Sequence, residues 1–247
     1  MELNLKALTF FRDKKLVLDS ISATIPSACL TCILGTNGAG KTTLLRILCG
    51  ELKPVNGTFL IGDIDTSARS QKEISKYFSI IPQKTPAPPY LTVSEMIALS
   101  RFDPQRALRW TLNNEDKRKI SMAMARCRIE EFKDRKVTEL SGGEQQRVWL
   151  SFGIASDKIF LILDETLDGM DVFAKRAFFL ILRELAQEGK GIILATHDLN
   201  MVKEYADKTI VLRQGKIVYQ GSANVDFQEL LGDENAATVA KCLRETA

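Results

Sequence analysis

Hydrophobic residues along the chain recur with two spacings, one typical of strands and one typical of helices. Residues 1–30 alternate apolar and polar side chains, as in LNLKALTF and LVLDSISATI, which predicts antiparallel strands. The other predicted strands are LTCILG, GTFLIGD, YFSIIP, KIFLILD and GIILATH, and the predicted helices between and after them are KTTLLRILCGEL, GGEQQRVWLSFGIAS, AKRAFFLILRELAQEG and LNMVKEYAD. Because strands alternate with helices, we expect a largely parallel sheet with ligands at the carboxyl ends of its strands.

Between residues 84 and 147 the alternation of strand and helix patterns gives way to a proline-rich stretch followed by helical patterns. The stretch 84–90, KTPAPPY, contains three prolines and is incompatible with a regular helix or a central strand. A helical pattern begins after Thr92, which forms a capping box with Glu95, and continues through the charged amphipathic segment NNEDKRKISMAMARCRIEEF. We therefore predict a helical subdomain over residues 84–147, inserted into an α/β domain.

The rest of the chain completes a single predicted domain of class α/β. Residues 1–83 and 148–222 are expected to form the core together with an antiparallel β subdomain. Near the end of this core, TIVLRQGKIVYQG predicts a hairpin that turns at Gln214 and Gly215. The C-terminal tail, residues 223–247, has a helical pattern and no motif that indicates a chemistry.

Composition narrows the class of protein without assigning a function. Hydrophobic residues make up 45% and charged residues 26% of the 247 positions, as in ordinary globular proteins. The formal net charge of +3 is too small to indicate a nucleic-acid partner. No apolar run approaches the roughly 20 residues that span a bilayer, and the first residues lack the pattern of a secretory signal. We therefore expect a cytoplasmic protein.

Cys29 and Cys32 form a C-x-x-C pair, but no second pair or nearby histidine completes a metal site. This favours the interpretation that both are buried residues of a strand.

The segment from Gly35 to Thr43, GTNGAGKTT, fits the pattern G-x-x-x-x-G-K-[ST] after a predicted strand and at the start of a predicted helix. In this context the pattern forms a phosphate-binding loop, because its glycines let backbone N–H groups turn toward phosphate oxygens. Lys41 reaches the β- and γ-phosphates, and the Thr42 hydroxyl is available to Mg²⁺. The residues expected to contact nucleotide here are Gly35, Thr36, Asn37, Gly38, Ala39, Gly40, Lys41, Thr42 and Thr43.

Two acidic residues end the apolar strand in IFLILDE. Asp164 is expected to hold Mg²⁺, and Glu165 to orient and deprotonate the water that attacks the γ-phosphate. Paired acids at a strand end are commonly just solvated helix caps. Downstream of a phosphate-binding loop they instead complete a site for ATP hydrolysis, because phosphoryl transfer needs little beyond placement and charge compensation.

The segment LSGGEQQR contains a second helix start. Ser141 and Glu144 satisfy the capping-box rule, and Gly142 with Gly143 permits a tight turn. A serine hydroxyl and glycine amides at a helix N-terminus also form an anion site. Since one small domain has no use for two γ-phosphate sites, we infer that these four residues serve the ATP of a second subunit.

Because it lies shortly before the strand that ends in acids, LSGGEQQR resembles the signature motif of ABC nucleotide-binding domains. Other landmarks of that family follow the expected order. Gln83 resembles the Q-loop glutamine, Asp171 at the end of DETLDGMD resembles the D-loop aspartate, and His197 in ATHD resembles the switch histidine. The resemblance covers about residues 3–222. It implies a RecA-like P-loop NTPase core with an antiparallel β subdomain and an inserted helical signature subdomain.

The resemblance also implies a working arrangement. Two copies of the chain would hold two MgATP between them, with Lys41, Glu165 and His197 catalytic and with Gln83 joining Thr42 and Asp164 at the metal.

The sequence departs from the family pattern at two positions near the catalytic glutamate. Thr166 replaces the usual proline, and Asp168 stands where a small residue is common, so the contact of this segment with its partner is expected to differ. The aromatic residue that stacks on adenine is Phe10 or Phe11, and Phe11 fits the spacing to Gly35 slightly better.

With no membrane segment in the chain, the resemblance implies separate permease subunits, as in bacterial importers. The segments PQKTPAPPYLTVSEMIALSRF and THDLNMVKEYADKTIVLRQGKIVYQG look most like the ATPases that power import of vitamin B12, iron-siderophores and haem. This implies a peripheral protein at the cytoplasmic face of the inner membrane that works indirectly with a substrate-binding protein. Three alternatives are an exporter subunit, a soluble ATPase of iron–sulfur assembly, and a nucleic-acid or ribosome factor. The last usually has two such domains or a coiled-coil arm.

Overall fold

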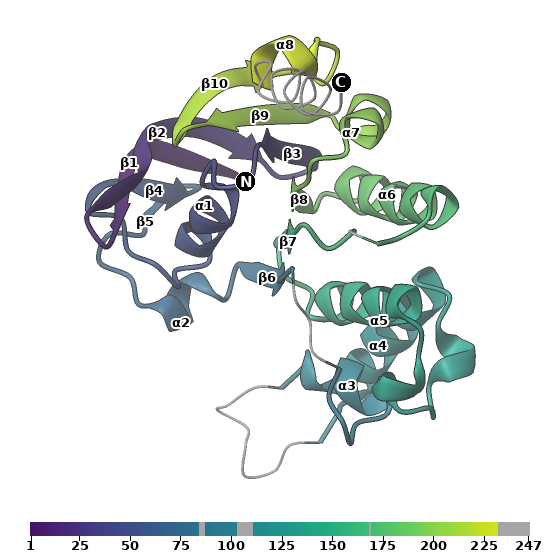
Figure 1. Ribbon diagram of the computed structural model, residues 1–247. Coiled ribbons are helices and arrows are strands. Elements are labelled where there is room, and N and C mark those ends of the chain that lie inside the picture. Colours follow the sequence, from purple (N-terminus) through teal and green to yellow (C-terminus); the bar gives the residue numbers. More distant parts are fainter. Residues whose placement is uncertain (84–86, 103–110, 168, 232–247) are drawn as a thin grey trace, which may run out of the picture.

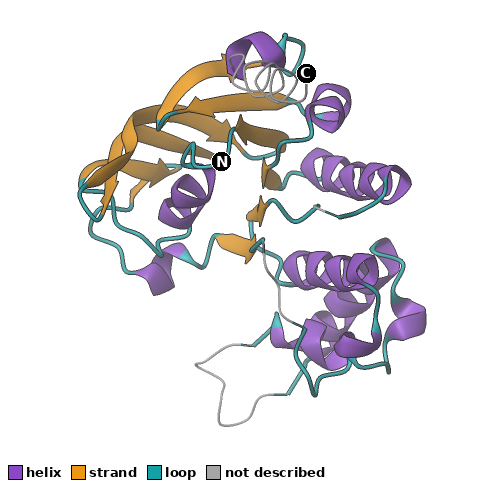
Figure 2. Cartoon of the chain, in the orientation of Figure 1, coloured by secondary structure: helices purple, strands orange, loops and turns teal. Residues whose placement is uncertain are grey.

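The computed structural model describes residues 1–83, 87–102, 111–167 and 169–231. Figure 1 shows two sheets and a group of helices that extends from one edge of the larger sheet. Figure 2 separates the strands from the helices in the same orientation, so the strand-rich half and the helix-rich half are visible at once.

The smaller sheet is antiparallel, with the strand order β2-β1-β4-β5. Its strands are β1 (Glu2–Arg12), β2 (Lys15–Pro26), β4 (Asn56–Ile61) and β5 (Ile64–Asp65). Alternate residues of β1, such as Leu3 and Leu5, are buried, while Glu2 and Lys6 are exposed. The antiparallel strands predicted for residues 1–30 are therefore confirmed, and the short strand β5 was not predicted.

The larger sheet has the order β10-β9-β3-β8-β7-β6, and all of its neighbouring pairs except β10–β9 are parallel. Its strands are β3 (Cys29–Gly35), β6 (Phe78–Ile81), β7 (Phe160–Asp164), β8 (Gly191–Ala195), β9 (Lys208–Arg213) and β10 (Lys216–Gly221). The hairpin between β9 and β10 turns at Gln214 and Gly215, which both have positive φ, as predicted. Because β3, β7 and β8 are adjacent and parallel, the segments that follow them meet at one edge of the sheet.

Side chains of β3 alternate between two hydrophobic cores on opposite faces of the larger sheet. Ile33 packs into the core that contains α1 (Lys41–Leu48) and the antiparallel sheet. Cys32 and Leu34 face the other core, which contains buried residues of α6 (Val172–Gln187) and α7 (Leu199–Tyr205). Cys29 and Cys32 are both buried and free, and burial raises the pKa of both thiols, as expected for strand residues.

The helix-rich half in the lower part of Figure 1 consists of α3 (Val93–Leu99), α4 (Asn114–Arg126) and α5 (Gly142–Ala155), which pack against one another. The capping box predicted for Thr92 and Glu95 is confirmed, with the Thr92 N–H donating to Glu95 Oε2 at 2.8 Å. Two short 3₁₀ turns, Glu130–Phe132 and Val137–Glu139, lead from α4 to α5.

Two predicted helices end earlier than expected. The helix predicted over KTTLLRILCGEL ends at Leu48, because Gly50 adopts a left-handed conformation and its N–H bonds the Ile47 carbonyl at 2.9 Å. The helix predicted over NNEDKRKISMAMARCRIEEF ends at Arg126, and Arg128 follows with φ of 53°. The four-residue helix α2 (Gln71–Ile74) was not predicted.

Two further expectations concern the membrane and the tail. No helix among the described residues is both long and apolar enough to cross a bilayer. The tail predicted over residues 223–247 contains helix α8 (Phe227–Leu231), and residues 232–247 lie outside the described part of the chain.

Candidate nucleotide-binding site

The predicted phosphate-binding loop joins β3 to α1. Gly38 and Gly40 have φ of 81° and 107°, values that favour glycine, and Gly40 is the N-cap residue of α1. A side-chain carbon on Gly35 would lie 2.5 Å from the backbone oxygen of Leu212 on β9, so the loop leaves the sheet in tight contact with the neighbouring strand. The loop therefore has the strand–turn–helix context that a phosphate cradle requires.

Lys41, the first residue of α1, is only 5% exposed, and its ammonium group lies within the loop. Lys41 Nζ donates to the carbonyl oxygens of Gly35 at 2.7 Å and Thr36 at 3.3 Å. The same nitrogen lies 3.0 Å from Glu165 Oε1. A buried ammonium with several oxygen partners is held in a defined position, because an unpaired charge in this environment would be costly.

Glu165 connects the phosphate-binding loop to the end of β6. Gln83, two residues after β6, donates from Nε2 to Glu165 Oε2 at 2.8 Å. Glu165 itself has a positive φ of 46°, and its N–H donates to the Ala195 carbonyl at the end of β8. The carboxylate therefore sits between a lysine from α1 and an amide from the β6 edge, at the carboxyl end of the sheet.

Asp164 and Thr42 bring two oxygen atoms together beside this carboxylate. The Thr42 hydroxyl donates to Asp164 Oδ1 at 3.1 Å. Burial raises the pKa of Asp164, the Thr42 bond opposes that shift, and the neighbouring Glu165 adds to it. In the described part of the chain, no group of three or more His, Cys, Asp or Glu residues could hold a metal by itself. Two oxygen donors of this kind fit Mg²⁺, which is usually bound by one or two protein oxygens together with substrate phosphates.

His197 follows β8 and lies at the same edge of the sheet. The preceding residue, Thr196, donates its N–H to the Ile33 carbonyl of β3 at 3.2 Å. His197 is exposed, and Asp198 after it is the N-cap residue of α7. The topology therefore brings His197 toward the edge that carries Lys41 and the acids of β7.

Two other predicted site residues, Asp171 and Phe11, are exposed at the surface. Asp171 is exposed and caps α6, accepting a bond from the Ala174 N–H at 2.9 Å. Phe11, at the end of β1, is 43% exposed, whereas Phe10 packs partly into a core.

The segment after Glu165 contains the two departures from the family pattern. Thr166 is buried, and its hydroxyl has no hydrogen-bond partner within the described part of the molecule. Asp168 lies outside the described residues.

The segment around Ser141 forms the N-terminus of α5, which belongs to the helix-rich half and lies apart from α1 (Figure 1). The predicted capping box is confirmed. The Ser141 N–H and hydroxyl both donate to Glu144 Oε2 at 2.7 Å, and these bonds lower the pKa of Glu144. A side-chain carbon on Gly142 or Gly143 would have no heavy atom of the described chain within 4 Å. Neither glycine has positive φ, so nothing described within this chain requires glycine at these two positions.

The ion pair between Lys175 and Asp198 is a feature of the site's border that the sequence did not reveal. It joins α6 to the residue after His197 at 3.0 Å. The one signal available in the sequence is that Asp198 heads a predicted helix, which indicates a cap but not a lysine partner.

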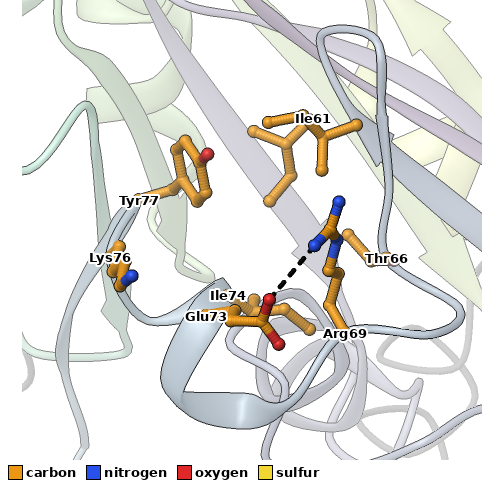
Figure 3. Close-up of a pocket in the computed structure, with 8 residues that line it drawn as sticks. Ile61, Thr66, Arg69, Glu73, Ile74, Lys76 and Tyr77 are labelled. Carbon is orange, nitrogen blue, oxygen red and sulfur yellow. Dashed lines mark hydrogen bonds and ion pairs between the residues drawn. The ribbon is translucent and has the colours of Figure 1, made fainter.

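A separate hollow of about 230 Å³ lies between β5 and α2, away from all of these residues. Figure 3 shows its lining, in which Arg69 and Glu73 form an ion pair. None of the predicted site residues lines this hollow.

A phosphate-binding loop after β3 and an acidic pair at the end of β7, a parallel strand of the same sheet, define a P-loop NTPase. The family model described as ABC transporter matches residues 18–168, more than half of the chain. The chain therefore belongs to the ABC transporter family, and it is an ATP-binding subunit of that family with ATPase activity.

Relatives with assigned roles support this conclusion. The chain is 33% identical over 231 residues to the petrobactin import ATP-binding protein FpuD of Bacillus anthracis, covering 93% of this chain and 84% of FpuD. It is 34% identical over 217 residues to the ferric enterobactin transport ATP-binding protein FepC of Escherichia coli, covering 87% of this chain and 79% of FepC.

A solved structure supports the fold. The dimeric ATP-binding cassette MJ0796 bound to ADP and Pi superposes with a TM-score of 0.78 at 25% identity, covering 90% of this chain and 99% of that one. The expected RecA-like P-loop core with its β and helical parts is thus confirmed as the fold class.

Proposed function

We propose that two copies of this chain close around two MgATP and hydrolyse them, and that each site combines the phosphate-binding loop of one copy with residues 141–144 of the other. The observation that carries the proposal is the open space beside Gly142 and Gly143. Glycine in the first turn of a helix costs stability relative to alanine. Glycines that the chain does not need for its own packing are explained if another molecule approaches the backbone closely there.

The chemistry of the α5 N-terminus favours an anion as that approaching group. The first backbone N–H groups of a helix point along its axis, and the helix dipole adds partial positive charge. This helix has 14 residues, and the exposed Ser141 hydroxyl lies at its start. The γ-phosphate held by the loop of a second copy fits these donors.

Hydrolysis would proceed at the junction of α1 and β7. A γ-phosphate would compete with Glu165 for the Lys41 ammonium, so ATP binding would free the carboxylate to accept a proton from the attacking water. Gln83 already bonds Glu165 and would orient the same water. His197 would donate a hydrogen bond to the γ-phosphate, because a neutral imidazole can donate from one nitrogen. Phe11 would stack on adenine, and Asp171 would contact the second copy.

The metal site would use the oxygens already paired beside the loop. Thr42 and Asp164, together with Gln83, would hold Mg²⁺, and the ion would neutralise charge on the transferring phosphoryl group.

Hydrolysis would power import of a metal chelate, such as an iron-siderophore, haem or vitamin B12, through separate permease subunits. A substrate-binding protein would deliver the chelate to these subunits. The functions named for FpuD and FepC support this substrate class. The chain would then lie peripherally at the cytoplasmic face of the membrane.

One experiment tests whether the partner is a membrane permease. A tagged Glu165→Gln chain is purified from detergent-solubilised membranes of its native organism in the presence of MgATP, and associated proteins are identified by mass spectrometry. We expect a polytopic permease. A soluble scaffold protein instead would indicate an ATPase of cofactor assembly and overturn the transport proposal.

Uptake assays test the substrate class. Cells that lack this chain should lose uptake of one labelled chelate among siderophore-bound iron, haem and vitamin B12. The unmutated chain should restore that uptake, and Lys41→Ala should not. Normal uptake of all three would overturn the substrate assignment while leaving the ATPase assignment intact.

A further inference from the structure

The loop that carries His197 is anchored on both sides of the histidine. Thr196 is buried, and its N–H bonds β3 at the Ile33 carbonyl. Asp198 donates its N–H to the Thr196 hydroxyl at 3.1 Å and accepts the Met201 N–H on Oδ1 at 3.2 Å. These bonds fix the loop to the sheet and to α7, and leave the second oxygen of Asp198 for another partner.

That partner is Lys175, the fourth residue of α6. Lys175 Nζ lies 3.0 Å from Asp198 Oδ2, and the two side chains are 20% and 21% exposed. Burial alone would raise the pKa of Asp198, yet the bonds from Lys175 and the Met201 N–H keep it below its usual value. A partly desolvated ion pair of this kind holds its geometry better than a pair in open solvent.

Lys175 is also bonded to the segment that is expected to meet the second copy. Its backbone N–H donates to the Asp171 carbonyl at 3.0 Å, and the Asp171 side chain caps the same turn through the Ala174 N–H. A continuous path of bonds therefore runs from Asp171 through Lys175 to Asp198, the neighbour of His197.

We propose that Lys175 is a positioning residue, which through Asp198 fixes His197 relative to the start of α6, so that contact of a second copy at Asp171 also sets the position of the histidine. This inference rests on the proposed function, in which His197 meets the γ-phosphate and Asp171 meets the second copy. Lys175 acts through Asp198 and does not itself need to touch the nucleotide.

The molecule contains its own control for this pair. Arg176 and Glu204 form a second ion pair between the same two helices, at 3.6 Å, but their side chains are 51% and 48% exposed. Ion pairs as exposed as this one contribute little to the stability of a protein. If the Lys175 pair mattered only by holding α6 against α7, removing the Arg176 pair would have a comparable effect.

The test compares Lys175→Met with Arg176→Met in ATPase assays on the full chain, together with thermal unfolding. We expect Lys175→Met to lower kcat about tenfold, the lower end of what outer partners of functional groups contribute. Its KM for ATP and its Tm should stay close to those of the unmutated chain. Lys175→Arg should restore most of the rate, and Arg176→Met should leave it unchanged.

A second variant, Asp198→Asn, tests the other member of the ion pair. Asparagine caps a helix as well as aspartate does, so α7 keeps its start while the charge is lost. Combined with Lys175→Met, it should add little to either single change, because the two residues act through one contact. Additive losses, or a Lys175→Met enzyme as active as Arg176→Met, would overturn the inference.

His197→Ala separates this inference from the function on which it rests. If His197→Ala keeps the unmutated rate, the assignment of the histidine fails and Lys175 has nothing to position. If His197→Ala is inactive while Lys175→Met is normal, the site stands and only the positioning role is wrong.

Discussion

Two glycine-containing segments that lead into helices, one before α1 and one at the start of α5, differ in the contacts that they make within the chain. At the loop that leads into α1, Gly35 at the end of β3 lies close against Leu212 of β9, and Lys41 and Thr42 each contact an acid at or just after the end of β7. At the start of α5, the cap is closed locally between Ser141 and Glu144, and the glycines inside it face open space.

The first segment forms a site from residues of one chain, whereas the second is a surface that remains open to another chain. Removing a group at the α1 start breaks contacts that are visible within the chain. Changing a glycine at the α5 start should change activity without breaking a contact within the described part of the chain. The predictions below test that separation.

The largest effect is expected from Lys41→Ala. The substitution removes the one buried ammonium of the phosphate loop, and hydrolysis should fall by about two orders of magnitude or more, as when a preorganised donor to developing charge is lost. Steady-state ATPase assays measure this. Activity near the unmutated rate would show that the loop is not the catalytic phosphate site.

Glu165→Gln should slow hydrolysis by about a hundredfold or more through loss of the general base, while ATP still binds. Because the bound nucleotide persists, the protein should accumulate as a dimer with MgATP. Light scattering with and without MgATP measures the mass. A variant that hydrolyses normally would exclude Glu165 as the base, and one that binds ATP yet stays monomeric at high concentration would count against the two-copy site.

Ser141→Arg should stop hydrolysis while leaving ATP binding to the single chain nearly intact, because the nucleotide is held by the α1 loop and the Arg blocks only closure. Ser70→Arg is the matched control. Ser70 forms the same kind of capping box with Glu73 at the start of α2, so it loses a similar cap without reaching the nucleotide. Ser70→Arg should keep its ATPase activity.

Mixing Ser141→Arg with Lys41→Ala sharpens this test. In a mixed dimer, one composite site carries both changes and the other carries neither, so some ATPase should return when two inactive proteins are combined. Loss of ATP binding by Ser141→Arg alone would instead place Ser141 in its own chain's nucleotide site.

How much of this the sequence could reveal depends on how local each feature is. The phosphate loop and the caps at Thr92 and Ser141 lie within nine residues or fewer, and their patterns were sufficient. The contact of Glu165 with Gln83 spans 82 positions, and only a family resemblance could suggest that both belong to one site.

Other features had no usable pattern at all. Lys175 and Asp198 lie 23 positions apart in the sequence, and many lysines could have paired with that aspartate. Helix ends were misjudged where a left-handed residue, Gly50 or Arg128, stops a helix that its hydrophobic spacing would continue.

The smallest expected changes are in stability, and they come from placing alanine at Gly35, the last residue of β3 before the α1 loop, or at Gly142 in the first turn of α5. At Gly35 the new carbon would meet a backbone oxygen at 2.5 Å, so Gly35→Ala should lower the free energy of unfolding by about 1–3 kcal/mol, as overpacking does. At Gly142 the carbon meets open space and the backbone is helical, so Gly142→Ala should raise the free energy of unfolding by about 0.5–1 kcal/mol.

Both variants should lose ATPase activity, Gly142→Ala because its methyl group obstructs the second copy. Urea unfolding measures the two opposite shifts. A Gly142→Ala chain that is more stable and less active would mean that this glycine is kept for a partner. A chain that is destabilised, or fully active, would mean that the open space at the α5 start has no such role.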